Sequence, residues 1–221
     1  MSAGVRVAAS ALVVGLLVAG CSVNGDPVGD ESDLTARAVA ASSFPSGPAT
    51  RVPTPAVKDA LADITGRPLR GDVSPAGCTP GAMRTESATV LVGASPQAGG
   101  VGTLTSAVVG TDESLADLTA TARRCPVVTL GAGGGATTRV STEVAPAPPT
   151  VDGVETTALR RSLQTGGDAA PLVTTVTLLI AQRDDVRVYV EERHQGAAPL
   201  TEEAGAALDR LFTASVSAAF G

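Results

Sequence analysis

Residues 172–193 have the sequence LVTTVTLLIAQRDDVRVYVEER, the clearest supersecondary pattern in the 221-residue chain. The first half, 172–182, is rich in Val, Thr, Leu and Ile, residue types that favour β-strands. The second half, 186–193, alternates apolar and polar residues, as a strand with one buried face does. Between them, Arg-Asp-Asp at 183–185 predicts the turn of a hairpin. We therefore expect two antiparallel strands, with Val186, Val188 and Val190 facing the core and Arg187, Tyr189 and Glu191 pointing outward.

Shorter segments on the N-terminal side of this hairpin predict further strands. They cover residues 88–94, 103–109, 127–130, 139–144 and 155–163. Their Val and Thr content and the turn residues between them are typical of strands that follow one another through hairpins.

Helical patterns flank these strands on both sides. A short helix is predicted over 34–41 after a Ser32-Asp33 cap, and another over 56–64 that Gly66 ends. A third is predicted over 111–124, with Thr111 as its cap, and a fourth begins after a cap at Thr201. The pattern indicates an α+β fold, with an antiparallel sheet of about five to six strands flanked by helices.

The N-terminus has the pattern of an export signal. A basic residue, Arg6, precedes the apolar run 7–18, which is too short for the roughly 20 residues that a membrane span needs. The run ends in Leu17-Val18-Ala19-Gly20-Cys21. This motif resembles the lipobox of bacterial lipoprotein precursors, and the resemblance implies that the chain is cut before Cys21, whose thiol receives a diacylglyceryl group. The alternative is an uncleaved signal anchor in which Cys21 has no such role.

This interpretation divides the chain into three parts. Residues 1–20 are the signal peptide, residues 21–31 a flexible tether, and residues 32–221 a single domain. The membrane is then a partner through lipidated Cys21, and the domain lies on the extracytoplasmic face of the cell membrane. The net charge of −6, without a clustered basic stripe, argues against nucleic acid as a partner.

The two other cysteines, Cys78 and Cys125, predict a single disulfide, because an even pair in an exported protein is most often oxidised. A metal site is the alternative for them. Zinc would need further ligands at paired spacing, and the chain has one histidine, so we expect no metal and no cofactor.

One group of residues suggests catalysis. His194 follows Glu191 and Glu192, and a carboxylate could orient its imidazole as a general base. The chain has neither G-x-S-x-G nor S-x-x-K to supply a nucleophile. We therefore predict no catalytic residues and a solvated surface position for His194.

Three other motifs suggest ligand binding but have plainer explanations. The glycine-rich run 131–135 lacks the Lys-Ser/Thr ending of a phosphate-binding loop and predicts a loop between strands. Asp184 and Asp185 could bind calcium but suit a hairpin turn. Arg160 and Arg161 should point to opposite faces of a strand, so that one of them either holds an anion in a cleft or forms a surface salt bridge.

A wider resemblance follows from Phe44-Pro45, the stretch 73–80 (VSPAGCTP) and Arg124-Cys125. Their order resembles that in mycobacterial and related actinobacterial cell-envelope lipoproteins that carry a domain of unknown function, similar to the extracellular sensor domain of PknH-type kinases. The resemblance implies an antiparallel sheet flanked by helices, with a cleft as the ligand site and no catalytic residues. Those sensor domains usually hold two disulfides, whereas this chain can form one.

Two functions are consistent with these observations. The first is a lipid-anchored, non-catalytic binding or sensor-like module that recognises a small molecule, a lipid or another envelope protein. The alternative is a hydrolase or transferase acting on envelope material, with an unrecognised site around His194.

The lipobox leads to a direct prediction. We expect Cys21→Ala to lose labelling by radioactive palmitate and to leave the membrane fraction, because a stable anchor needs the acyl chains on this thiol. Labelling and fractionation of intact cells check this, with Cys78→Ala as the control that keeps its label. A membrane-bound, labelled Cys21→Ala protein would contradict the prediction.

Overall fold

The computed structural model describes residues 34–69, 71–97, 102–131, 137–149, 153–166 and 171–221. These residues all belong to one compact unit, Ser32–Gly221. The signal peptide, the tether and Cys21 lie outside the described residues, so lipidation stays a prediction. No helix in the described ranges is long and apolar enough to cross a membrane.

Within the described residues, nine strands form a single antiparallel sheet in the order β1-β3-β4-β9-β8-β7-β6-β5-β2. Seven of them correspond to the segments expected from the sequence: β3 (Met83–Ala94), β4 (Gly102–Thr111), β5 (Val127–Leu130), β6 (Thr138–Ala145), β7 (Glu155–Thr165), β8 (Leu172–Arg183) and β9 (Val186–Gln195). The other two are β1 (Thr50–Arg51) and β2 (Val73–Ser74), each two residues long at an edge of the sheet. The antiparallel sheet with flanking helices is confirmed. The expected strand number of five to six is wrong. All seven segments expected from the sequence belong to the sheet, and the two-residue strands β1 and β2 are too short to show an alternating pattern.

The β8–β9 hairpin lies at the centre of the sheet, as its pattern predicts. Arg183 pairs with Val186, so the turn consists of Asp184 and Asp185 alone. Asp184 adopts a left-handed conformation with φ of 54°, which aspartate tolerates better than most residues do. Asp184 and Asp185 therefore form the hairpin turn that the sequence predicts.

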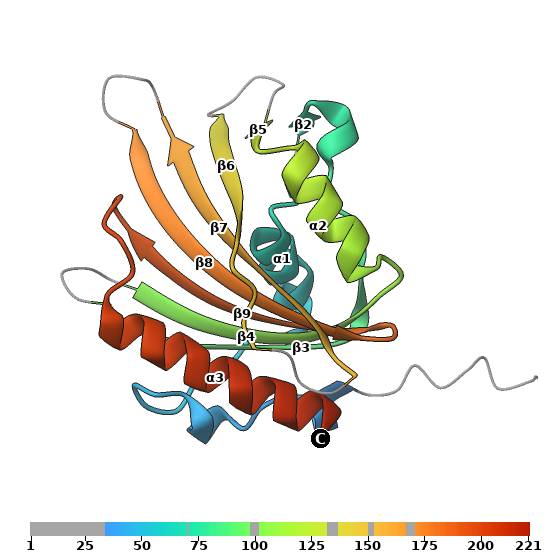
Figure 1. Ribbon diagram of the computed structural model, residues 1–221, viewed down its shortest axis with the longest axis vertical. Coiled ribbons are helices and arrows are strands. Elements are labelled where there is room, and N and C mark those ends of the chain that lie inside the picture. The colour runs from blue at the N-terminus through green and yellow to red at the C-terminus, as the bar shows by residue number, and fades with distance from the viewer. Residues whose placement is uncertain (1–33, 70, 98–101, 132–136, 150–152, 167–170) are drawn as a thin grey trace, which may run out of the picture. The chain divides into compact units, whose positions relative to one another are not determined.

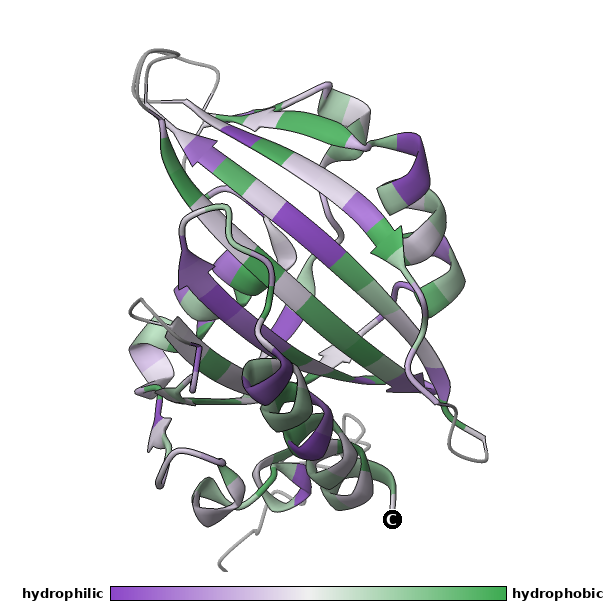
Figure 2. Cartoon of the chain, turned by 60° about the vertical axis from the view of Figure 1, so that its left-hand side comes forward, coloured by the Kyte–Doolittle hydropathy of each residue, from purple (hydrophilic) through white to green (hydrophobic). Residues whose placement is uncertain are grey.

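Helices cover both faces of the curved sheet (Figure 1). The helix α3 (Glu202–Phe220) packs on one side against β9, β4 and β8, and we call this side the α3 face. The helices α1 (Thr54–Thr65) and α2 (Leu115–Arg124) pack on the other side, the α1 face. Hydrophobic and hydrophilic residues alternate along the long strands (Figure 2).

The two covered faces explain one wrong prediction. Val186, Val188 and Val190 pack with α3, as expected. Arg187, Tyr189 and Glu191 point the other way, but they are buried beneath α1 and α2 with exposures of 0%, 1% and 3%. An antiparallel strand often has one wet face, and β9 does not.

The predicted helices agree with the helices in the structure to different degrees. The helix α1 ends where Gly66 takes a left-handed conformation, as expected, and Thr201 caps α3 by accepting a hydrogen bond from the Ala204 N–H. The helix α2 begins later than expected, because Thr111 still belongs to β4 and the cap is Ser114. Instead of a helix over 34–41 there are two 3₁₀ turns, η1 (Leu34–Arg37) and η2 (Ala41–Ser43).

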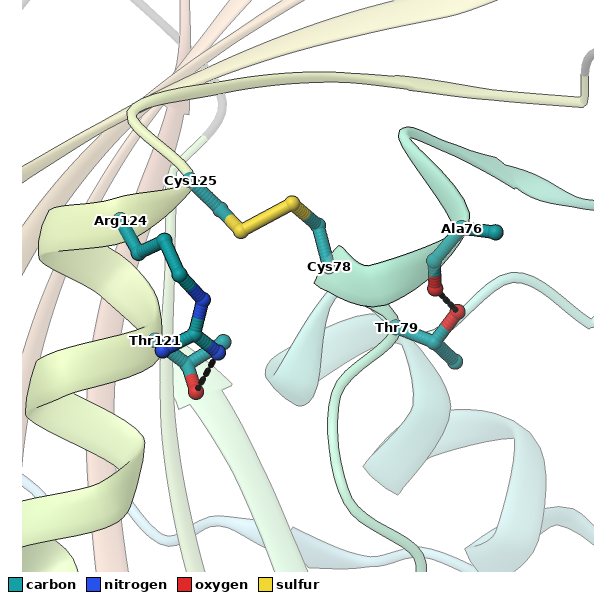
Figure 3. The surroundings of a disulfide bond; sticks show 6 residues. All are labelled: Ala76, Cys78, Thr79, Thr121, Arg124 and Cys125. Atoms are coloured by element: carbon teal, nitrogen blue, oxygen red, sulfur yellow. Dashed lines mark hydrogen bonds between the residues drawn. A yellow bond between two sulfur atoms is a disulfide. The ribbon is translucent and has the colours of Figure 1, made fainter.

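The predicted disulfide between Cys78 and Cys125 is present (Figure 3). It joins the 3₁₀ turn η3 (Ala76–Cys78) to the C-terminal end of α2, with a Cα–Cα distance of 5.8 Å. Since β2 lies just before η3 and pairs only with β5, this bond holds the edge of the sheet against α2.

We expect Cys78→Ala/Cys125→Ala to lower the free energy of unfolding by about 4 kcal/mol, because the bond closes a loop of 47 residues in the unfolded chain. Urea denaturation checks the value. Wild-type protein with its disulfide reduced should match the double variant, and an unchanged midpoint for both would contradict the prediction.

Candidate functional site

A cleft of about 490 Å³ opens on the α1 face, between the C-terminal end of α1 and strands β5 to β9. We call it the α1 cleft. Its described wall residues are largely aliphatic, and the charged groups among them are one aspartate and three arginines. The apolar wall residues are Ala62, Pro68, Leu69, Leu130, Val140, Leu163 and Val176, and the charged residues are Asp63, Arg67, Arg161 and Arg193.

Strand register places two of these arginines side by side on the sheet. Arg161 of β7 and Arg193 of β9 are both directly opposite Val176 of the intervening strand β8. Their backbones are therefore two strand spacings apart, roughly 10 Å. Directly opposed residues point to the same face, so both guanidinium groups lie on the α1 face.

Arg161 is attached to the end of α1. Its Nη1 donates a 2.6 Å hydrogen bond to the backbone oxygen of Ile64, in the last turn of the helix, where a cation is favourable. A Cβ on Gly66 would lie 3.6 Å from the same Nη1. Within the described ranges this is the one hydrogen bond of the guanidinium, and Arg161 is among the residues that line the α1 cleft.

Burial lowers the pKa of Arg161, while the nearby Glu191 and Tyr189 raise it. A guanidinium remains charged even so, because its ordinary pKa lies far above neutral pH. The group is therefore a cation with unused donors at a partly desolvated position.

Arg193 is held on two sides. Its Nε donates to Glu191 Oε1 at 2.9 Å, and its two terminal nitrogens contact both carboxylate oxygens of Asp63, at 3.1 and 2.9 Å. Burial lowers the pKa of Arg193, but Glu191 and Asp63 outweigh this and raise it. The bidentate contact joins β9 to α1, as the Arg161 bond joins β7 to α1.

Glu191 is the buried acid of this cluster. Its Oε2 is buried and has no hydrogen-bond partner in the described part of the chain. Burial raises the pKa of Glu191, and Arg193 lowers it to a smaller extent. A shift in this direction favours the neutral acid, while the contact with Arg193 favours the carboxylate.

A second buried arginine has a structural role. Arg187 donates to Gln182 Oε1 at 2.7 Å and to the Tyr189 hydroxyl at 3.0 Å, and it pairs with Glu113 at 3.2 Å. These contacts hold the segment before α2 against the sheet. The neighbouring cavity beside the disulfide has a volume of about 70 Å³, room for a few water molecules.

His194 is not the solvated surface residue that the sequence predicts, since its exposure is 2%. Its Nδ1 lies 2.9 Å from Glu192 Oε2, and its Nε2 lies 2.9 Å from the backbone oxygen of Ala198. A carboxylate and a carbonyl oxygen both accept hydrogen bonds, so these two contacts favour the ring form in which both nitrogens donate, the imidazolium. An imidazolium has no lone pair with which to take a proton, which argues against a general base.

The contacts of His194 explain its burial. Glu192 also accepts a bond from Ser95 Oγ, at 2.9 Å. Gln97 bonds to Pro199 O and to Thr201 N, so the group joins the segment after β3 to the segment that leads into α3. These hydrogen bonds hold the start of α3 next to the sheet.

Of the other motifs singled out in the sequence, the Arg160-Arg161 pair contributes to the site and the rest do not. Residues 132–135 of the glycine-rich run lie outside the described residues. No group of three or more potential metal-ligating side chains occurs within the ranges that the structure describes. Arg160 and Arg161 do point to opposite faces, as predicted: Arg160 is exposed and Arg161 lines the α1 cleft.

Sequence reasoning missed Asp63, Arg67 and Arg193 as parts of this site. Arg193 carried a usable signal, because it continues the series 187, 189 and 191 on one face of β9. Asp63 and Arg67 flank the end of α1, and nothing in the sequence indicates where that end meets the sheet.

We expect His194→Gln to be less stable than wild type by about 2 kcal/mol at pH 5.5, because Glu192 loses a charged partner. Burial lowers the pKa of His194, but the bonds to Glu192 and Ala198 outweigh this and raise it. A raised folded-state pKa means that the contribution is complete below the unfolded value of about 6.5 and is lost as pH rises through the folded value. Urea denaturation from pH 5.5 to 9 checks this, and a deficit that grows with pH would contradict it.

No protein-family model matches the chain, and no curated protein does. Two solved structures are similar to it. One is an uncharacterized protein from Mycobacterium smegmatis, with a TM-score of 0.43 and 16% identity, covering 78% of this chain and 85% of that one. The other is the extracellular domain of PknH from Mycobacterium tuberculosis, with a TM-score of 0.37 and 14% identity, covering 76% of this chain and 98% of that one.

Proposed function

We propose that this protein is a non-catalytic binding module of the cell envelope, anchored through Cys21, and that its ligand occupies the α1 cleft. The observation that carries the proposal is Arg161. Its guanidinium lines an apolar-walled cleft of about 490 Å³ and makes a single hydrogen bond to the described part of the chain. A volume of this size lies within the range of about 300–1,000 Å³ that small-molecule sites occupy.

The energetics support a ligand at this position. A charged group withdrawn from water is costly unless its hydrogen bonds are replaced. Arg193 obtains this replacement from Asp63 and Glu191, whereas Arg161 obtains it in part, from the Ile64 carbonyl. Acceptor atoms of a ligand would complete the set.

The anchor supports the same function. Residues 21–31 would serve as the tether between lipidated Cys21 and the domain, so that the α1 cleft samples the extracytoplasmic side of the cell membrane. The sensor-like role that the sequence resemblance implies is compatible with a module that binds and reports a ligand. The alternative enzyme depends on His194, whose two ring nitrogens both face acceptors.

Native mass spectrometry tests the proposal. The protein is the whole mature chain with Cys21→Ala, exported behind a cleavable signal without a lipobox, so that no detergent is needed. After incubation with a cell-envelope extract, we expect the wild-type chain to carry a bound small molecule. Thr138→Trp, which places a large ring at the wall of the α1 cleft, should lose most of this adduct, about tenfold or more.

The matched control is Thr177→Trp, the same change on the α3 face of the sheet. It should keep the adduct. A clean unliganded mass for the wild-type chain, or equal adducts in both tryptophan variants, would overturn the proposal.

A further inference from the structure

The α1 cleft has two arginines next to the end of α1, and aliphatic side chains predominate in the rest of its described lining. Arg161 and Arg193 lie in one row across the sheet, next to the end of α1. Two residues further along β7, Leu163 lies opposite Val140 of β6. Beyond them, Leu130 of β5 and Leu69 complete the walls, and Leu69 is 59% exposed.

From this arrangement we infer that the ligand is a single-chain amphiphile with an anionic head group, bound with its head at Arg161 and Arg193 and its chain along Leu163, Val140 and Leu69. The inference rests on the proposed function, because it names the class of ligand for the same cleft.

Charge determines the sign of the head group. Among the described residues three arginines line the cleft, and Asp63 is the one acid that lines it with them. Glu191 pairs with Arg193 but is not among the described residues that line the cleft. The chain as a whole has a net charge of −6, so the cleft differs in sign from the rest of the protein and should concentrate anions. The planar guanidinium of Arg161 suits a carboxylate or a phosphate, either of which can accept two of its donors.

The apolar walls of the cleft indicate what the rest of the ligand is. A free inorganic anion would fill the polar end and leave the aliphatic walls in contact with water. An aliphatic chain would cover them, including the exposed side chain of Leu69, and apolar burial of this kind is favourable. A volume of about 490 Å³ suits one chain better than the two chains of a membrane lipid.

Isothermal titration with ligands that share one chain tests the inference on the same Cys21→Ala mature protein. The probes are laurate and dodecyl phosphate, dodecyltrimethylammonium as the cationic counterpart, and acetate and inorganic phosphate as heads without chains. We expect one or both dodecyl anions to bind, the cation not to bind, and the chainless anions to bind at least about 100-fold more weakly. The comparison of laurate with dodecyl phosphate identifies which head group the site takes.

Chain length gives an independent readout. Decanoate and octanoate should bind progressively more weakly than laurate, by about fourfold for each methylene removed, if the chain is buried along the walls. Leu163→Ser should lower laurate affinity without changing acetate binding. An affinity independent of chain length would overturn the inference.

Adjacent arginines on opposite faces supply the matched pair of variants. Arg161→Gln should weaken binding of the dodecyl anion by about tenfold or more, and Arg160→Gln should leave it unchanged. Arg161→Lys keeps the charge and should recover part of the affinity. Circular dichroism melts confirm that each variant is folded. If Arg161→Gln fails to fold, Leu163→Ser and the length series still decide the question.

The outcomes separate the two proposals. If the envelope-extract experiment yields a ligand that Thr138→Trp excludes, but neither dodecyl anion binds, the inference about ligand class fails while the binding function stands. Equal affinity for phosphate and dodecyl phosphate would also overturn the inference, because the site would then take a plain anion. If neither experiment detects binding, both proposals fail.

Discussion

The central sheet is covered by helices on both of its faces, and this constraint shapes the rest of the molecule. The strand β9 lies between β4 and β8, with α3 on one side and α1 and α2 on the other. Every residue from Val186 to Glu192 is therefore buried, although three of them carry a formal charge. A buried charge needs a partner, so Arg187, Glu191 and Glu192 determine what must lie next to them.

The partners come from segments far away in the sequence. Arg187 is satisfied by Glu113 and Gln182, and Glu192 by Ser95 and His194. These contacts connect the sheet to the segments that lead into α2 and α3. Charged groups inside the fold thus position its helices, with the apolar residues of the two cores packed around them.

The cluster at the end of α1 is not fully paired within the described part of the chain. Asp63 pairs with Arg193, whereas Arg161, which lines the α1 cleft, makes one hydrogen bond. An incompletely satisfied cluster at the end of an apolar-walled cleft is the arrangement that a binding site has before its ligand arrives. This is why we place the function here and not at His194, whose hydrogen bonds are complete.

Local pattern alone was sufficient for several elements: the strand over 186–193, the Thr201 cap, the Gly66 stop and the disulfide pair were all predicted correctly. These features depend on neighbouring residues and on backbone preferences, which a sequence displays directly. Tertiary structure alone decided that the second face of β9 is covered, that His194 is buried between two acceptors, and that Arg161 and Arg193 flank Val176. Burial and register are set by segments up to 130 residues apart, such as Asp63 and Arg193, and no local pattern records which distant segment will lie opposite.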